Sequence, residues 1–426
     1  MTSLSATTER IRAAEAIAEC RLIASMSEEP VRNQEPLQTT RRFLTPPVVS
    51  VHAHLRTRMQ ALGMSVHTDA IGNLRGLWQP PNATGKRLLL GSHIDTVPNA
   101  GAFDGVLGVV LALEWVRLAQ EQNLPLPIEV VAFSEEEGVR YPVSFLSSHA
   151  LAGTLDLKVL DLVDADGIRI EDAIRAFGLD PSQIPAAAID SNVLGYIELH
   201  IEQGPVLDVE GLPLAVVEGI AGQSRLGFRF IGHANHAGTT PMHLRRDALA
   251  AAATWMTEIE SLARNTEGLV ATIGKLTLEP NATNVIPGCV DLSLDLRHMN
   301  DQVLAEALQQ SVQKAQATAA DRGLQVEWIQ KTSEPSIRMD PALSSELAAA
   351  VQAAGYPPRS IPSGAGHDAM ILAHRVPSAM LFLRSPGGIS HHPDETVLEE
   401  DVEAALKTGR IFLSRIAKSN SASVLK

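Results

Sequence analysis

Apolar and polar positions alternate with helical periodicity in two N-terminal stretches, residues 7–27 and 45–62, which predict amphipathic helices. Between them the charged stretch SEEPVRNQEPLQTTRRFLTP predicts a surface loop. Runs typical of strands follow, VHTDAIGNLRGLW and then RLLLGSHIDTV after the turn signal QPPNATG. We expect a helix from about 105 to 122, followed by another apolar run, PIEVVAFSEEEG. Residues 141–190 are expected to be mostly helical, and LGYIELHIEQG after them is typical of a further strand. Strands alternating with helices are typical of α/β architecture with buried strands.

The pattern changes near residue 220. QSRLGFRFIGH alternates like a strand with one exposed face, and RRDALAAAATWMTEIESLAR has the periodicity of a helix. Two strand-like runs follow, LVATIGKLTLE and GCVDLSLDLRH, and then a helix across 301–322 and a strand, LQVEWIQKTSE. This β-α-β-β-α-β order predicts a small antiparallel sheet with two helices on one face.

The α/β pattern resumes with a helix at 341–354, the strand VPSAMLFL and a last helix at 399–417. We therefore expect an α/β domain with a mixed central sheet flanked by helices, interrupted by a smaller ferredoxin-like α+β domain. The expected boundaries are 1–219 and 336–426 for the first domain and 220–335 for the insert.

Length and composition narrow the class of protein. The 426 residues exceed what one ordinary core encloses, which agrees with two domains. Cys20 and Cys289, the only cysteines, cannot form a disulfide framework and are typical of a reducing compartment. The N-terminus lacks the apolar core of a secretory signal, and apolar stretches such as 105–116 are too short to span a bilayer. A net charge of −14 argues against nucleic acid or anionic membrane as partners, so we expect a soluble cytoplasmic protein.

Side chains that bind metals gather where the apolar runs end. In open α/β sheets, functional groups lie at the carboxyl ends of the strands. Histidines and carboxylates together suit zinc and similar divalent ions, and three consecutive glutamates allow one to ligate while its neighbour takes a proton. Any single histidine or charged run is more often structural, so the prediction of a metal site depends on the co-occurrence of these residues: His93, Asp95, Asp104, Glu135, Glu136, Glu137, His200, Glu202, His391 and His392.

Several motifs together resemble a known family. GSHIDTVPNAGAFDGVLGV, FSEEEGVR, LHIEQGP, GHANHAGTTPM, RRDA, NVIPG, SGAGHDAM and ISHHPDE are similar to the co-catalytic metal amidohydrolases of the aminoacylase and carboxypeptidase superfamily. Within it they resemble the branch that contains allantoate amidohydrolase, N-carbamoyl-L-amino-acid hydrolase and β-ureidopropionase. The resemblance covers residues from about 10 to 415, in the expected order, and it implies that the larger domain is catalytic and that the insert is a lid and dimerisation domain.

The resemblance implies two divalent ions per subunit, Zn²⁺ or Mn²⁺ and possibly Co²⁺, with Glu136 as general base. The shifted assignment, with Glu136 as ligand and Glu135 as base, stays open. His391 is preferred to His392 because family members place this ligand four residues before a glutamate, here Glu395. Asp95 is expected to accept a hydrogen bond from His93 and to fix its tautomer. The ligands implied are His93, Asp104 (bridging), Glu137, His200 and His391.

Other residues receive substrate roles by resemblance. His236 would stabilise the oxyanion from the other subunit of a homodimer, and Gln203 would contact the ureido group. Asn284 and Arg297 would together hold the substrate carboxylate when the insert closes, with Arg297 as a bidentate clamp in an acidic protein. The turn that contains Gly366 and His367 would offer backbone amides to the same carboxylate. A homodimer is also favoured by the mostly apolar helices and the exposed sheet edge of the insert.

The expected reaction is hydrolysis of a ureido (N-carbamoyl) C–N bond in a small molecule that carries a carboxylate. The segments TRRFLTPPV and GVRYPVSFLSSHALAG resemble allantoate amidohydrolases more than the other two enzymes. This resemblance implies allantoate as substrate, which would yield ureidoglycine, ammonia and carbon dioxide in purine catabolism. N-carbamoyl-L-amino-acid hydrolase, or β-ureidopropionase, is the alternative. A dipeptidase-like exopeptidase is more distant, because EQGP follows a histidine where many peptidases have a carboxylate. A non-catalytic binding protein on this fold is disfavoured, since no ligand or base is missing.

Overall fold

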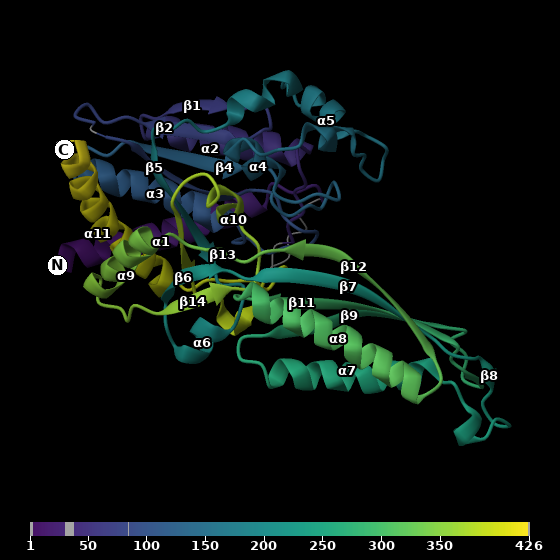
Figure 1. Ribbon diagram of the computed structural model, residues 1–426. Helices are drawn as coiled ribbons and strands as arrows, with labels where there is room; N and C mark the ends of the chain where they lie inside the picture. Colours follow the sequence, from purple (N-terminus) through teal and green to yellow (C-terminus); the bar gives the residue numbers. More distant parts are fainter. Residues whose placement is uncertain (1–2, 30–37, 84, 425–426) are drawn as a thin grey trace. The chain divides into compact units, whose positions relative to one another are not determined.

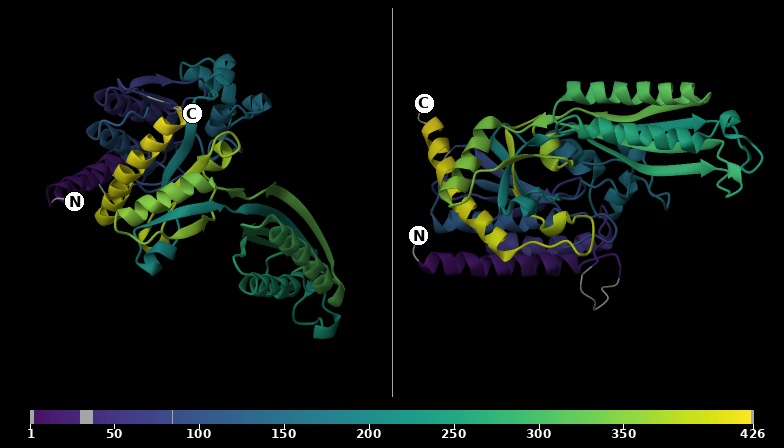
Figure 2. Two further views of the ribbon diagram at one scale, coloured as in Figure 1. Left: turned by 60° about the vertical axis from the view of Figure 1, so that its left-hand side comes forward. Right: turned by 90° about the horizontal axis from the view of Figure 1, so that it is seen from below.

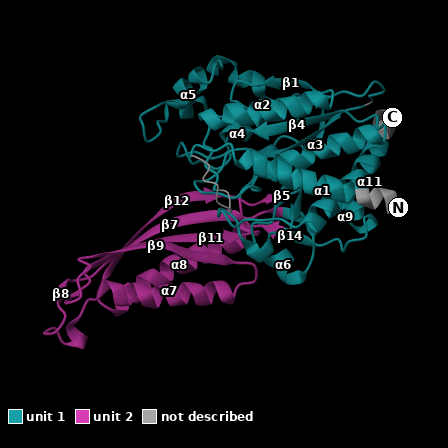
Figure 3. Ribbon diagram, turned by 180° about the vertical axis from the view of Figure 1, so that it is seen from behind, with its two compact units in different colours: residues 1–218, 339–361, 366–426 teal, residues 219–338, 362–365 magenta. Residues whose placement is uncertain are grey.

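The computed structural model describes residues 3–29, 38–83 and 85–424, so the loop expected over residues 27–46 lies partly outside the described chain. The chain folds into two compact units (Figure 3). Unit 1 comprises Met1–Glu218, Met339–Ile361 and Gly366–Lys426, and unit 2 comprises Gly219–Arg338 and Pro362–Ala365.

A mixed sheet forms the centre of unit 1, with strand order β1-β2-β4-β3-β5-β15-β6-β13 and with β14 paired to β6. Strand β3 runs parallel to β4 and β5, and β5 runs parallel to β15, whereas β2 and β6 are antiparallel to their neighbours. The strands of this sheet are β1 (Ser65–Thr68), β2 (Leu74–Trp78), β3 (Arg87–His93), β4 (Ile128–Phe133), β5 (Val193–Ile201), β6 (Leu214–Ile220), β13 (Ile337–Arg338), β14 (Ser360–Ser363) and β15 (Ser378–Leu383).

Helices flank this sheet (Figure 1). They are α1 (Ser3–Ala24), α2 (Pro46–Ala61), α3 (Val106–Glu121), α4 (Leu146–Ala152), α5 (Ile170–Ala176), α6 (Val206–Glu210), α9 (Pro341–Ala353), α10 (Asp368–Leu372) and α11 (Glu399–Val424), with short 3-10 helices η1 (Leu157–Asp161), η2 (Pro181–Ala187) and η4 (Pro386–Gly388).

Burial on both faces explains why the central strands read as continuous apolar runs. All residues of β3, β4 and β15 are buried. In β15, Leu381 and Leu383 belong to the large core that joins the sheet to α1, α2, α3, α9 and α11. Phe382 lies between them in the sequence, so it points to the opposite face, where its ring packs on His367 at the start of α10.

Unit 2 is a four-stranded antiparallel sheet of order β12-β7-β11-β9 with two helices along one face (Figures 1 and 2). Alternate residues of β7, including Phe228 and Phe230, are buried and pack against Trp255 of α7. The elements are β7 (Gly222–Ile231), α7 (Ala248–Arg264), β9 (Val270–Glu279), β11 (Cys289–His298), α8 (Asp301–Asp321) and β12 (Gln325–Glu334), with a small ladder of β8 (Asn235–His236) and β10 (Val285–Ile286), and a 3-10 helix, η3 (Met242–Leu244).

The predicted fold class is confirmed: the protein is mixed α/β, with a mixed central sheet flanked by helices. The stretch 141–190, expected to be mostly helical, contains only the short helices α4 and α5 and the 3-10 helices η1 and η2. Strands β6, β13 and β14 were not predicted. Within the described residues, no helix combines the length and the apolar character needed to cross a membrane.

Candidate functional site

The candidate metal ligands come from neighbouring strands of the central sheet. His93 is the last residue of β3, His200 lies near the end of β5, and Glu136 and Glu137 follow β4. Strands β4, β3 and β5 are adjacent and parallel, so their carboxyl ends meet at one edge of the sheet. The topology therefore brings together groups that are far apart in the sequence.

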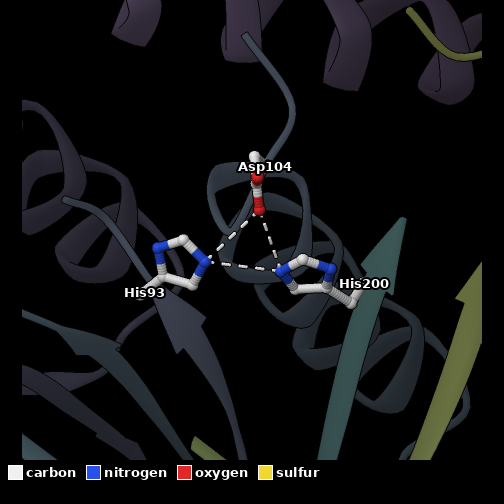
Figure 4. A group of neighbouring side chains, drawn as sticks. All are labelled: His93, Asp104 and His200. Carbon is white, nitrogen blue, oxygen red and sulfur yellow. Dashed lines mark hydrogen bonds and ion pairs between the residues drawn. The ribbon is translucent and has the colours of Figure 1, made fainter. Parts of the chain in front are cut away.

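Asp104 lies at the centre of the cluster of candidate metal ligands, which comprises His93, Asp104, Glu136, Glu137, His200 and His391. Its Oδ1 lies 3.4 Å from His93 Nε2 and 3.2 Å from His200 Nε2, and the two imidazole nitrogens are 3.4 Å apart (Figure 4). All three side chains are buried. Asp104 Oδ1 makes no hydrogen bond within the described chain, so a strong acceptor is left beside two imidazoles.

Backbone carbonyls set the orientation of both imidazoles. His93 Nδ1 lies 3.0 Å from the backbone oxygen of Asp95, and His200 Nδ1 lies 2.9 Å from that of Ile201. A carbonyl only accepts, so each Nδ1 carries the proton and donates it. The lone pair of each Nε2 is then directed towards Asp104, which is the tautomer that a metal ligand needs.

A glycine permits the close approach of Asp104 to His93. Gly105 follows Asp104 at φ 66°, and a Cβ atom there would lie 2.5 Å from the His93 ring. Both the left-handed conformation and the contact exclude a side chain. Gly105 therefore lets the turn before α3 bring the Asp104 carboxylate up to the imidazoles.

His391 lies on the other side of Asp104. Its Nε2 is 3.3 Å from Asp104 Oδ2 and 3.7 Å from Glu137 Oε1. His392, the alternative considered from the sequence, is exposed, and its contact is with the neighbouring Asp394 at 3.5 Å. Asp104 thus has the two imidazoles of β3 and β5 at one oxygen and His391 at the other, as a bridging carboxylate requires.

The three consecutive glutamates have different surroundings. Both carboxylate oxygens of Glu135 accept backbone hydrogen bonds, from Gly138 N at 2.6 Å and from Leu146 N at 3.0 Å. Glu136 and Glu137 instead lie beside His93, with ligand atoms within 4.8 Å of one another. Glu135 is therefore occupied in folding its own loop, which weighs against the shifted assignment.

Asp95 holds the loop that carries these glutamates. Its carboxylate accepts from Glu136 N at 3.0 Å and from Glu137 N at 3.1 Å. The expected contact with His93 is longer, 3.5 Å from Nδ1 to Asp95 Oδ1. The backbone oxygen of Asp95 is thus the nearer acceptor for His93, and its carboxylate positions the next strand end.

The electrostatics of the cluster fit divalent cations. Burial raises the pKa of Glu136 well above its ordinary value, and burial together with repulsion from Asp104 raises the pKa of Glu137 to about 7. Buried carboxylates that repel one another are stabilised by a cation between them. Three groups have ligand atoms close enough to share an ion: His93, Asp104 and His200; His93, Glu136 and Glu137; and Asp104, Glu137 and His391.

Gln203 joins this cluster and keeps one acceptor free. Its Nε2 donates to Asp104 Oδ2 at 3.0 Å, and its backbone N donates to Ser385 Oγ at 3.1 Å. Gln203 Oε1 is buried and has no hydrogen-bond partner among the described residues. The residue also adopts φ 59°, which is uncommon for a side chain larger than glycine. An unpaired amide oxygen beside the cluster is suited to accept a hydrogen bond from a ligand N–H.

The remaining predicted residues have other surroundings. The ring of His367 is buried and packs on His200 with centroids 4.5 Å apart, so this side chain supports a candidate ligand. Gly366 lies against Phe145. Glu202, singled out in the sequence, accepts from Val206 N and Leu207 N and caps α6.

His236, Asn284 and Arg297 belong to unit 2, whereas the cluster belongs to unit 1. His236 and Asn284 are neighbours, because His236 pairs with Val285 in the β8 and β10 ladder and Ala237 N donates to the Asn284 carbonyl at 3.0 Å. Arg297 donates to Asp295 through Nε and Nη2, at 2.9 and 3.1 Å, and through Nη1 to Gly364 O at 2.5 Å.

Asn284 and Arg297 lie at opposite ends of β11. The backbone oxygen of Gly288, just before this strand, accepts a hydrogen bond from Gly232 N. Asn284 directly precedes β10, which pairs with β8 at one end of unit 2 (Figure 1). A rise of about 3.3 Å per residue separates Cys289 from Arg297 by about 26 Å. The expectation that the insert brings both side chains to one carboxylate stays a prediction, and β11 separates the two positions along unit 2.

Sequence reasoning assigned no role to Ser385 and Ser390, although Ser390 Oγ donates to Asp104 Oδ2 at 3.1 Å. Glu395 served only as a landmark for His391, yet its carboxylate accepts from Asp104 N at 2.9 Å. Isolated serines and a glutamate in a charged stretch carry no periodic or spacing signal, so only the folded geometry identifies them.

Comparison with known proteins agrees with this geometry. Residues 89–415 match Peptidase family M20/M25/M40. The chain is 42% identical over 351 residues to an N-carbamoyl-L-amino acid amidohydrolase of Geobacillus stearothermophilus, covering 80% of this chain and 85% of that protein. It is 37% identical over 399 residues to an allantoate deiminase of Arabidopsis thaliana, covering 86% and 76%.

A solved structure shares the fold. An amidase of the hydantoinase/carbamoylase family from Burkholderia multivorans superposes with a TM-score of 0.87 at 31% identity, covering 95% of this chain and 97% of that one. The resemblance drawn from the sequence motifs is thereby confirmed. The chain belongs to Peptidase family M20/M25/M40, in the branch of the allantoate and N-carbamoyl-L-amino-acid amidohydrolases, and it is a hydrolase.

Proposed function

We propose that this hydrolase holds two divalent ions and cleaves a ureido C–N bond in a small carboxylate substrate, with allantoate as the preferred substrate. The observation that carries the proposal is the arrangement around Asp104, with two imidazoles at one carboxylate oxygen and a third at the other. His93, Asp104 and His200 would hold one ion, and Asp104, Glu137 and His391 the other. When bound, such ions polarise a carbonyl and make a water molecule acidic enough to ionise near neutral pH.

Glu136 would act as the general base and acid. Its carboxylate is buried beside the candidate ligands, and among the described residues it accepts no backbone hydrogen bonds like those that occupy Glu135. It would take a proton from the attacking water and return it to the departing nitrogen. This transfer is needed because both nitrogens of a ureido group donate electrons into the carbon, and the leaving nitrogen must be protonated to depart.

Gln203 would orient the ureido group. A ureido N–H is a donor, and Gln203 Oε1 is an acceptor without a partner in the described chain. Its Nε2 is fixed by Asp104 and Ser390, so the direction of Oε1 is fixed as well. The amide would therefore discriminate ureido N–H groups from substrates that present only acceptors at this position.

The separation of Asn284 from Arg297 supports an active site shared by two subunits. His236 and Asn284 are adjacent at one end of unit 2, so they would enter a site together. Arg297 is at the other end of β11 and would hold the carboxylate from its own subunit, exchanging its present partner Asp295 for the substrate. We therefore place His236 and Asn284 in the site of the partner subunit of a homodimer.

Allantoate is proposed as the first candidate because the segments TRRFLTPPV and GVRYPVSFLSSHALAG resemble those of allantoate amidohydrolases. N-carbamoyl-L-amino acids are the second candidate, favoured by the 42% identity to the amidohydrolase of Geobacillus stearothermophilus. Both substrates carry a ureido group and a carboxylate. The roles proposed for Glu136, Gln203 and Arg297 apply to either of them.

Ammonia release from the two substrate types tests the proposal. Metal-free protein would be reconstituted with Mn²⁺ or Zn²⁺ and assayed with allantoate, with N-carbamoyl-L-amino acids and with a dipeptide, and the organic product identified by mass. A higher kcat/KM for allantoate, with ureidoglycine formed, is the expected result. Preference for carbamoyl amino acids would retain the chemistry and change the substrate. Activity on the dipeptide alone would overturn the proposal.

A further inference from the structure

Glu395 connects the two segments that supply Asp104 and His391. Its side chain is 4% exposed, and its Oε1 accepts hydrogen bonds from Phe103 N at 2.8 Å and Asp104 N at 2.9 Å. Its Oε2 lies 3.4 Å from the hydroxyl of Ser390, the residue before His391. One buried carboxylate therefore contacts the backbone of one candidate ligand and the neighbour of another.

Ser390 provides a second link between the same segments. Its Oγ is 3.1 Å from Asp104 Oδ2 and 3.4 Å from Glu395 Oε2. A hydroxyl has one proton, so it donates to one of these carboxylates at a time, and the nearer is Asp104. The Asp104 backbone is thus held mainly by the two hydrogen bonds that Phe103 N and Asp104 N donate to Glu395 Oε1.

Close packing around Glu395 indicates that the fold fixes the position of its side chain. A Cβ atom on Gly101 would lie 2.5 Å from Glu395 Cβ, so only glycine allows the two segments to approach this closely.

Phe103 and Asp104 also precede the first turn of α3, so a helix-capping role is the simpler explanation of their hydrogen bonds. The two explanations differ, because a cap affects helix stability whereas a positioning residue affects the geometry of the ligands.

We propose that Glu395 is a positioning residue that sets Asp104 and His391 at the separation at which both bind one ion. The inference depends on the proposed metal site. It assigns the residue to the ion shared by Asp104, Glu137 and His391, since that ion has ligands from both of the segments that Glu395 joins. The ion held by His93 and His200 depends less on Glu395, because those imidazoles are oriented by their own backbone carbonyls.

Two substitutions of Glu395 separate the effect of side-chain length from the effect of charge. Glu395→Gln keeps a carbonyl-type oxygen at the position of Oε1, which still accepts from both backbone N–H groups. Glu395→Asp keeps the charge but withdraws the carboxylate by one carbon–carbon bond, about 1.5 Å. Asp394→Ala, at the exposed neighbouring position of the same loop, is the matched control. Glu395→Ala removes the contact entirely.

Metal binding, rather than turnover, is the readout. Metal-free proteins would be titrated with Mn²⁺, with bound ions counted by equilibrium dialysis and the coupling of the two ions followed by electron paramagnetic resonance. We expect Glu395→Asp and Glu395→Ala to bind the second ion about 10–100-fold more weakly and to lose the spin-coupled signal. Glu395→Gln and Asp394→Ala should resemble the wild type. Thermal unfolding of the metal-free forms checks that each variant is folded.

Three results would overturn the inference. Wild-type affinity for both ions in folded Glu395→Asp would show that the position of the carboxylate does not matter. Loss of the second ion in Glu395→Gln would show that its charge, and not its hydrogen bonds, is required. A wild type that binds fewer than two ions would overturn the proposed metal site itself, and this result is distinct because it appears before any substitution is made.

Discussion

At the scale of single residues, hydrogen bonds around the cluster determine which atoms are left to bind an ion. The types and order of the candidate ligands could be predicted from the sequence, because His93, His200 and the glutamates follow apolar strands. The partners of these residues could not. These partners include the backbone oxygen of Asp95 and the backbone amides of Glu136 and Glu137. Because almost every residue has a backbone carbonyl and amide, residue type does not indicate which of them will pair.

Asp95→Ala tests the role of that pairing. The substitution leaves the N–H groups of Glu136 and Glu137 without their acceptor, so the loop that carries both glutamates is no longer held against β3. We expect metal affinity to fall by about 10–100-fold, with a similar loss of activity. Metal titration of the folded variant measures this effect. Unchanged affinity would mean that the loop holds its position without Asp95.

At the scale of secondary structure elements, apolar periodicity predicted most of the long helices and strands, but it missed β6, β13 and β14. Strand β6 was missed because its run LAVVEGI follows turn residues and has no polar alternation, and β13 has only two residues. Periodicity also does not reveal a polar side chain on a buried face. Helix α2 buries His52 together with Val48, Val51, Leu55 and Met59.

His52 makes the stability of the protein depend on pH. Burial, with a contribution from Arg56, lowers its pKa from 6.5 to about 4, and its Nε2 has no hydrogen-bond partner among the residues described. The unfolded chain therefore takes up a proton first as pH falls. The associated stability is fully present above pH 6.5 and is lost as the pH falls towards 4.

Comparison of the wild type with His52→Leu isolates this effect. Between about pH 7 and pH 5 the free energy of unfolding of the metal-free wild type should fall by about 2 kcal/mol more than that of the variant. Denaturant unfolding at the two pH values measures the difference. Equal losses in the two proteins would show that His52 titrates normally in the folded state.

At the scale of the whole molecule, the important feature is the distance between Asn284 and Arg297 along unit 2. The sequence contains the information needed to find it, since GCVDLSLDLRH is recognisable as a strand and a strand of that length separates its ends by more than two side chains can span. The motif resemblance implies that both residues contact one carboxylate. The proposed function therefore assigns His236 and Asn284 to a site that a second subunit completes.

Mixing two inactive variants tests the shared site. In the proposed homodimer, His236→Ala and Glu136→Gln are each expected to disable every site. In a mixed dimer, one site combines an intact Glu136 with His236 of the other subunit, so random exchange should restore about a quarter of wild-type activity. Ammonia release after denaturation and joint refolding measures the recovery. No recovery, with mixed dimers demonstrated by mass, would place His236 in the site of its own subunit.

The most direct test of the central claim is the metal content and turnover of Glu136→Gln. The substitution preserves the size of the side chain and leaves all the proposed ligands in place, but removes the group that accepts the proton of the attacking water. The protein should bind two ions and unfold at the wild-type temperature, while ammonia release falls by about 10²–10⁴-fold. Near-normal turnover with full metal content would contradict the account.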